Sequence, residues 1–171
     1  DEMMVLTGAC NLRRHLDAGI TSLREHGARN KVGFIIKEAL SRGYIPGPRM
    51  QVSGRPITCT GGHFHMCNEE ADGPDEIRRS VRRLVHEGAD YIKITATGGS
   101  TRTSFPLLPS FNLDELMAIV DEAHKFGILT ATHCTSTLGI ENSLDSGVDM
   151  IIHCIFKEPD GQFEFREDIA D

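Results

Sequence analysis

One phrase recurs four times along this chain of 171 residues: an amphipathic helical stretch, a glycine, and then a short apolar stretch. It occupies residues 16–23, 85–94, 123–133 and 144–153. A glycine just after a helix takes the left-handed conformation that ends the helix and turns the chain. Helices that alternate with apolar strands predict a parallel α/β sheet covered by helices, because parallel strands need a crossover between them.

Five strands are expected, near residues 20–24, 50–54, 90–95, 128–133 and 149–153. One helix is expected to begin at Pro74, and another at Asn112 with Glu115 completing a capping box. A doubly wound sheet of five strands would be complete at this length. A (β/α)8 barrel needs about 250 residues, so the chain would be a little over half of one. The positions of the candidate functional residues have to decide between these two folds.

Charge and composition exclude several classes of partner. The formal net charge is −7, whereas nucleic-acid binding needs concentrated Lys and Arg. The arginines at 78, 79, 82 and 83 have helical spacing and are interpreted as a solvated helix face. No apolar run approaches the roughly 18 residues of a membrane helix. Five cysteines, an odd number without a C-x-x-C pair, favour a reducing cytoplasm. A small-molecule substrate fits best.

Three successive predicted strands end in side chains that can bind a metal: Lys93, His133 and His153. Functional residues gather at the carboxyl ends of parallel strands. Because side chains alternate along a strand, Ile92 and Ile94 should point to the face opposite Lys93. By the same alternation, Cys134 and Cys154 should point away from their neighbouring histidines, which makes both poor ligands.

A lysine within an apolar strand calls for a chemical explanation, because burying an ammonium group is costly. Lys93 could be a neutral amine that forms a Schiff base with a carbonyl substrate. It could instead capture carbon dioxide and become a carbamate, whose two oxygens can bridge two divalent metals. The carbamate gives His133 and His153 a role, since neutral imidazole binds zinc well.

Two glycine-rich loops lie near these strands. In Thr60-Gly-Gly-His63-Phe-His65 we interpret His63 as a substrate contact and expect no essential role for His65. Gly98-Gly99 could let the backbone approach a substrate, and turn formation is an equally good explanation. The other four histidines are not expected to be ligands: His15, His26, His86 and His124.

The run from Gly19 to Gly161 resembles the amidohydrolase superfamily, in its imidazolonepropionase-like and prolidase-like group. The resemblance rests on Gly-Ile-Thr-Ser-Leu-Arg-Glu (19–25), Gly-Pro-Arg-Met (47–50), Thr-Gly-Gly-His (60–63), Gly-Ala-Asp-Tyr-Ile-Lys-Ile (88–94), Ala-Thr-His (131–133) and Gly-Val-Asp-Met-Ile-Ile-His (147–153).

This resemblance implies that residues 1–171 form the central part of a (β/α)8 TIM barrel, about strands 2 to 6. It implies a binuclear zinc centre bridged by carboxylated Lys93, with His133 and His153 holding the second metal. The implied reaction is hydrolysis of amide-type C–N bonds in a dipeptide, an N-acyl amino acid or a cyclic amide. A homo-oligomer stays an open alternative. Cys134-Thr135-Ser136 stands where some prolidase-like relatives carry an aromatic residue, which leaves the substrate open.

Two elements that the resemblance implies are not in the sequence. An H-x-H pair is expected before residue 1, and a proton-shuttling Asp after residue 171. We therefore expect no catalytic residue in this chain and no activity from it alone. Two other functions are left open. Residues 88–94 also resemble the Schiff-base strand of class I aldolases, and a non-catalytic barrel fragment would need neither missing element.

Overall fold

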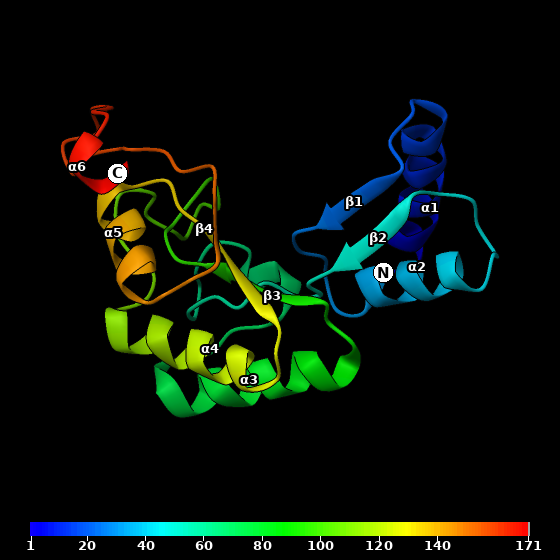
Figure 1. Ribbon diagram of the computed structural model, residues 1–171, viewed down its shortest axis with the longest axis horizontal. Helices are drawn as coiled ribbons and strands as arrows, with labels where there is room; N and C mark the ends of the chain where they lie inside the picture. Colours follow the sequence, from blue (N-terminus) through cyan, green and yellow to red (C-terminus); the bar gives the residue numbers. More distant parts are fainter. Residues whose placement is uncertain (171) are drawn as a thin grey trace.

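A computed structural model describes residues 1–170 as an α/β arrangement with two parallel sheets (Figure 1). The strands are β1 (Ser22–Glu25), β2 (Arg49–Val52), β3 (Tyr91–Thr95), β4 (Leu129–His133) and β5 (Met150–Ile152). The helices are α1 (Glu2–Asp17), α2 (Val32–Ser41), α3 (Gly73–Glu87), α4 (Leu113–Lys125), α5 (Thr137–Asp145) and α6 (Glu167–Ala170), with a 3-10 turn η1 (His65–Cys67). The five expected strands are confirmed to within two residues at either end.

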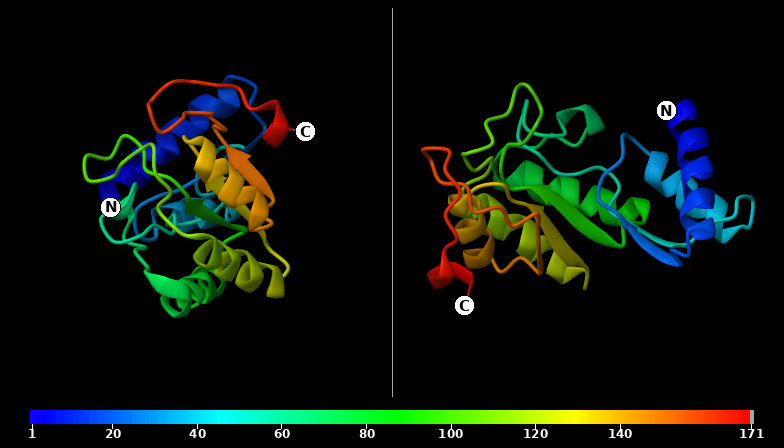
Figure 2. Two further views of the ribbon diagram at one scale, coloured as in Figure 1. Left: turned by 90° about the vertical axis from the view of Figure 1, so that its left-hand side faces the viewer. Right: turned by 90° about the horizontal axis from the view of Figure 1, so that it is seen from above.

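One sheet pairs β1 with β2, and the other has the order β3-β4-β5. The figures place β1, β2, α1 and α2 at one end of the molecule and α3, α4 and α5 with the larger sheet at the other (Figures 1 and 2). Between the sheets, Ile57 forms a parallel bridge to Ile94 of β3. All pairings between the five strands are parallel, as the alternation of helices and strands predicts.

The helix ends follow the local sequence. The four repeated glycines (Gly19, Gly88, Gly127 and Gly147) all have positive φ. At Gly88, the φ of 97° and two backbone hydrogen bonds to the last turn of α3 make the predicted stop. The capping box of α4 is present, because Asn112 accepts from the Glu115 N–H and Glu115 accepts from the Asn112 N–H.

The core lies between the larger sheet and its helices. Every residue of β3 is buried, and Ile92 and Ile94 pack with Ile77, Leu84 and Ile119 of α3 and α4. A smaller cluster of Leu12, Val32 and Ile36 lies under α1 and α2. The parity expected for Ile92 and Ile94 is confirmed.

The opposite face of the strands is called the inner face. On this face a small cavity lies between the two sheets. Its lining includes Arg24, Gln51, Tyr91, Ala131 and Met150. Arg24 of β1 contacts the Met150 sulfur of β5 at 3.6 Å. The five strands therefore curve enough for the first and last to meet by their side chains.

The arginines of α3 are not simply solvated. Arg82 and Arg78 lie 2.6 and 3.9 Å from the carboxylate of Glu122, which is 2% exposed. Arg83 pairs with the buried Glu69. Half-exposed arginines thus neutralise buried carboxylates, which a sequence pattern alone does not reveal. Of the helices described, none has both the length and the apolar character needed to span a membrane.

Candidate metal centre

Lys93 lies on the inner face of β3 and is 2% exposed. Its amine has one weak hydrogen bond, 3.4 Å long, to the Ile94 carbonyl oxygen. No carboxylate among residues 1–170 lies within ion-pair distance of it. Burial lowers the pKa of Lys93 to about 7. A large share of this lysine is therefore a neutral, nucleophilic amine near neutral pH.

His133 is the last residue of β4 and is 6% exposed. The register pairs Lys93 with Ala131 and His133 with Thr95, so Lys93 lies one side-chain layer deeper on the inner face. Burial, and then the charges of Lys93, His63 and His153, lower the pKa of His133 to about 3. Its Nε2 lies 3.2 Å from the Gly98 carbonyl oxygen. A carbonyl can only accept, so Nε2 carries the proton and Nδ1 keeps a lone pair.

His153 follows β5 by one residue and is exposed. Its ring centroid lies 4.7 Å from that of His133, at an angle of 75° between the ring planes. His153 has φ 71° and Cys154 has φ 47°. Two successive non-glycine residues in the left-handed region cost on the order of 1–2 kcal/mol each. Such strain concentrates at functional sites.

His63 lies in the loop after β2 and is 5% exposed. Its ring centroid is 4.7 Å from that of His133, and its Nδ1 is 2.7 Å from the Thr101 hydroxyl. The three imidazoles of His63, His133 and His153 thus form a continuous group. The intervening Phe64 has φ 65°, so residues 63–65 are not extended and do not present the two histidines as an H-x-H pair.

The Gly98-Gly99 pair makes room for two neighbours. A Cβ on Gly99 would lie 2.6 Å from His63 Nε2, and one on Gly98 would lie 2.1 Å from the Phe105 carbonyl oxygen. Gly99 is therefore explained by the close approach of the His63 ring. Thr135 holds the same loop, since its hydroxyl lies 3.0 Å from both the Gly98 and Pro106 carbonyl oxygens.

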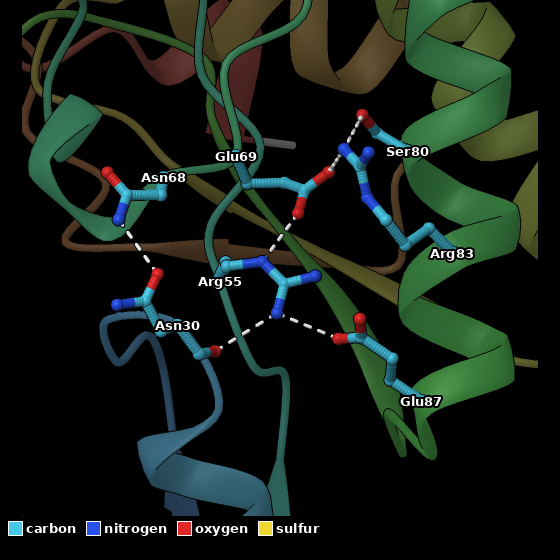
Figure 3. Close-up of polar contacts among 7 residues, drawn as sticks. All are labelled: Asn30, Arg55, Asn68, Glu69, Ser80, Arg83 and Glu87. Carbon is cyan, nitrogen blue, oxygen red and sulfur yellow. Dashed lines mark hydrogen bonds and ion pairs between the residues drawn. The ribbon is translucent and has the colours of Figure 1, made fainter. Parts of the chain in front are cut away.

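The loop that carries His63 is held by a buried ionic network (Figure 3). Arg55 Nε donates to Glu69 at 2.6 Å, and its Nη1 lies 3.0 Å from the Asn30 carbonyl and 2.7 Å from Glu87. Glu69 also pairs with Arg83. Because Arg55 and Glu69 stand at the two ends of residues 55–69, their ion pair closes the loop around His63.

The two cysteines near the histidines behave differently from ligands. Cys134 is fully buried, and its sulfur contacts Ser143 of α5 at 3.2 Å, on the side opposite the inner face. Burial raises the pKa of its thiol. Cys154 is exposed. The expectation that Cys134 points away from His133 is confirmed.

His26, which the sequence did not single out, also reaches the inner face. Its Nδ1 lies 2.9 Å from the Tyr91 hydroxyl, and the two rings meet edge to face at 5.4 Å. Tyr91 donates to the Glu25 carbonyl at 2.5 Å. The alternation of side chains could have indicated this placement, because His26 follows Arg24 by two residues at the end of β1 and should share its face.

The chemistry of Lys93, His133 and His153 fits a divalent metal ion. It offers neutral imidazoles with a free nitrogen and a buried amine without an anionic partner, which can become anionic by carboxylation. Within residues 1–170, no three side chains of His, Cys, Asp and Glu are grouped to hold an ion by themselves. Lysine is outside that set, so the fit depends on Lys93.

The chain matches the model of the amidohydrolase family over residues 2–167. It is 27% identical to ochratoxinase from Aspergillus niger, with the match covering 84% of this chain and 35% of that enzyme. The match to the crystal structure of a Xaa-Pro dipeptidase with bound methionine has a TM-score of 0.84 at 29% identity, covering 88% of this chain and 41% of that one.

Two further solved structures are similar. A. niger ochratoxinase has a TM-score of 0.80 at 26% identity, over 89% of this chain and 41% of that one. A structure described as a prolidase from Bifidobacterium longum has a TM-score of 0.73 at 30% identity, over 87% of this chain and 36% of that one. The chain thus spans about two fifths of the length of these relatives.

Proposed function

The chain belongs to the amidohydrolase family, and we propose that it forms strands 2 to 6 of a (β/α)8 barrel that hydrolyses amide-type C–N bonds at a binuclear zinc centre. The observation that carries this proposal is the buried Lys93 amine without a carboxylate partner, beneath the connected imidazoles of His133 and His153. The curved inner face, on which Arg24 meets Met150, supports the barrel.

Lys93 is proposed to react as a neutral amine with carbon dioxide. The Nζ lone pair forms a bond to the carbon, one C=O π bond becomes a C–O⁻, and the nitrogen loses a proton to solvent. The product is an anionic carbamate with two oxygens. The lowered pKa of Lys93 supports this step, because only the unprotonated amine is nucleophilic.

His133 and His153 are proposed to hold the second metal together with this carbamate. The low pKa of His133 keeps its ring neutral at any physiological pH, so protons do not compete for its free nitrogen. Two divalent ions bound there would supply a Lewis acid for the scissile carbonyl and make a water molecule more acidic. We assign the catalytic base to none of residues 1–170.

His63 is proposed to contact the substrate. The Nδ1 of His63 forms a hydrogen bond with the Thr101 hydroxyl. Because Gly99 has no side chain, no Cβ of that residue lies against the His63 Nε2. The proposed substrate is a small amide: a dipeptide, an N-acyl amino acid or a cyclic amide. Ochratoxinase and the Xaa-Pro dipeptidase are the similar enzymes that motivate this range. All five cysteines are free, which supports a cytoplasmic location.

The Schiff-base alternative would use the same neutral lysine. It leaves the connected rings of His63, His133 and His153 without a role, and membership of the amidohydrolase family favours hydrolysis. Borohydride trapping separates the two chemistries. Covalent labelling of Lys93 by a carbonyl substrate would favour the imine.

Metal content and its dependence on bicarbonate test the proposal. Zinc bound to the full-length protein is measured after dialysis, with and without added bicarbonate, for the wild type, Lys93→Met and the control Lys31→Ala, whose side chain is exposed. We expect wild type and control to bind zinc more tightly with bicarbonate, and ¹³C-bicarbonate to give a carbamate NMR signal that Lys93→Met lacks. Undiminished zinc binding in Lys93→Met would refute the bridge.

A further inference from the structure

His26 occupies the end of β1 in the same way as the candidate ligands occupy the ends of β4 and β5. Arg24 lies on the inner face, where it contacts Gln51 and Met150 and stands 6.0 Å over the Tyr91 ring. Residues two apart on a strand share a face, so His26 also faces inward. Its contact with Tyr91 agrees with this placement.

The hydrogen bonds around His26 determine which of its nitrogens is free. The Tyr91 hydroxyl has one proton, and it donates that proton to the Glu25 carbonyl, which can only accept. The phenol oxygen must therefore accept from His26, which places the imidazole proton on Nδ1.

Nε2 of a neutral His26 is thus left with a lone pair. None of the hydrogen bonds found within residues 1–170 involves this atom. Burial first, and then the Lys93 charge, lower the pKa of His26. A histidine that donates one N–H to an oxygen and offers the other nitrogen is the usual form of a metal ligand.

Lys93 follows Tyr91 by two residues on the same face of β3. The residue that orients His26 is therefore the neighbour of Lys93 on the inner face, one side-chain layer below it. From this juxtaposition we propose that His26 Nε2 is a further ligand of the metal centre, on the β1 side of Lys93, with Tyr91 fixing its tautomer. The inference rests on the metal-dependent function proposed above.

Zinc affinity, measured by competition with a chelator, tests this assignment without reference to activity. Four proteins are compared in the presence of bicarbonate: wild type, His26→Gln, Tyr91→Phe and His86→Gln, which changes an exposed histidine of α3. We expect His26→Gln to weaken zinc binding by about 100-fold and Tyr91→Phe by about tenfold, because the phenol only orients the ligand. His86→Gln should bind as the wild type does.

Histidine ¹⁵N NMR gives a second readout that does not depend on the folding of a variant. In the metal-free wild type we expect the Nδ1–H tautomer at His26, and a shift of its Nε2 signal when zinc is added. Zinc binding that depends on Lys93 but leaves His26 Nε2 and the His26→Gln affinity unchanged would overturn this assignment alone. No zinc binding in the wild type would overturn both proposals.

Discussion

The two sheets of this chain differ in how deeply their strand residues are buried. In β3 every residue is buried, and helices α3 and α4 cover its outer face with large apolar side chains. In β1 exposed and half-buried residues alternate, and the cluster under α1 and α2 holds only three buried residues. The larger sheet is thus backed by an extensive core, whereas the smaller sheet is backed by a small cluster.

A few polar contacts join the regions. Asp90, just before β3, accepts from Lys37 of α2 and from the Val52 backbone N–H, both at 2.7 Å. Arg55 connects Asn30 to Glu69 and Glu87. Lys93, His133 and His153 belong to the larger sheet, and His26 belongs to the smaller one. The proposed metal centre therefore takes three of its ligands from one side of this junction and one from the other.

Removing the junction arginine should have the largest effect. Arg55→Met leaves Glu69, which is 0% exposed, and Glu87 without their shared cation, although Arg83 still reaches Glu69. Breaking a buried ion pair from one side costs about 3–5 kcal/mol. We expect a loss of about 3 kcal/mol in the free energy of unfolding, measured with urea. Arg42→Met, which removes an exposed pair with Glu38, should cost less than about 1 kcal/mol. Equal losses of unfolding free energy in the two variants would show that the ion pairs of Arg55 stabilise the protein no more than an exposed pair does.

Lys93 should destabilise the metal-free protein in a pH-dependent way. Its pKa falls from 10.5 to about 7 on folding, so the stability is greatest above pH 10.5 and is lost as the pH falls to about 7. Lys93→Met removes this penalty. In bicarbonate-free buffer we expect the variant to be more stable than the wild type by about 2–3 kcal/mol at pH 8, and by much less at pH 10.5. A variant that is less stable at both pH values would contradict a buried neutral amine.

Glu25 should show the opposite dependence in the smaller sheet. Burial raises its pKa from 4.5 to about 7, and one of its oxygens is buried without a hydrogen-bond partner. Its protonated form is favoured by folding, so the stability is full below pH 4.5 and is lost as the pH rises to about 7. Between pH 4.5 and 8 the wild type should lose about 2 kcal/mol that Glu25→Gln does not lose. The exposed Glu164→Gln serves as the control, and a wild-type pH profile in the Glu25 variant would refute this origin.

The smallest expected difference concerns the helix caps. Asn112 caps α4 through two reciprocal hydrogen bonds of 2.9 Å, whereas Lys31 stands at the start of α2 without a side-chain cap. Asn112→Ala should lower the free energy of unfolding by about 1 kcal/mol. Lys31→Ala should change it by no more than a few tenths. A comparable loss in both variants would mean that the capping box adds no stability in this protein.

The sequence predicted the strands well, because each depends on local chemistry. The glycines after the helices, the apolar strand residues and the Asn112 cap act within a few residues of their own positions. The parity of Ile92 and Ile94 against Lys93 followed from the alternation of side chains. The left-handed backbone at His153 and Cys154 was not visible, because neither residue is a glycine and only a few per cent of other residues have a positive φ.

The candidate site was predictable only in part. Lys93 and His133 stood out because a charged or polar side chain ends an apolar strand. His63 was selected for its loop, but its contact with Thr101 and its dependence on Gly99 join segments almost forty residues apart. His26 was set aside because nothing near it in the chain suggests Tyr91 as a partner, which lies 65 residues away.

By itself the sequence determined the order of helices and strands, the burial of Lys93 and the three strand ends that can bind a metal. These depend on side-chain periodicity and on the conformational preferences of single residues. The tertiary structure alone decided how the imidazoles meet, which tautomer His26 adopts and how Arg55 joins the two regions. Such properties depend on hydrogen bonds and burial between distant segments, and only folding brings those segments together.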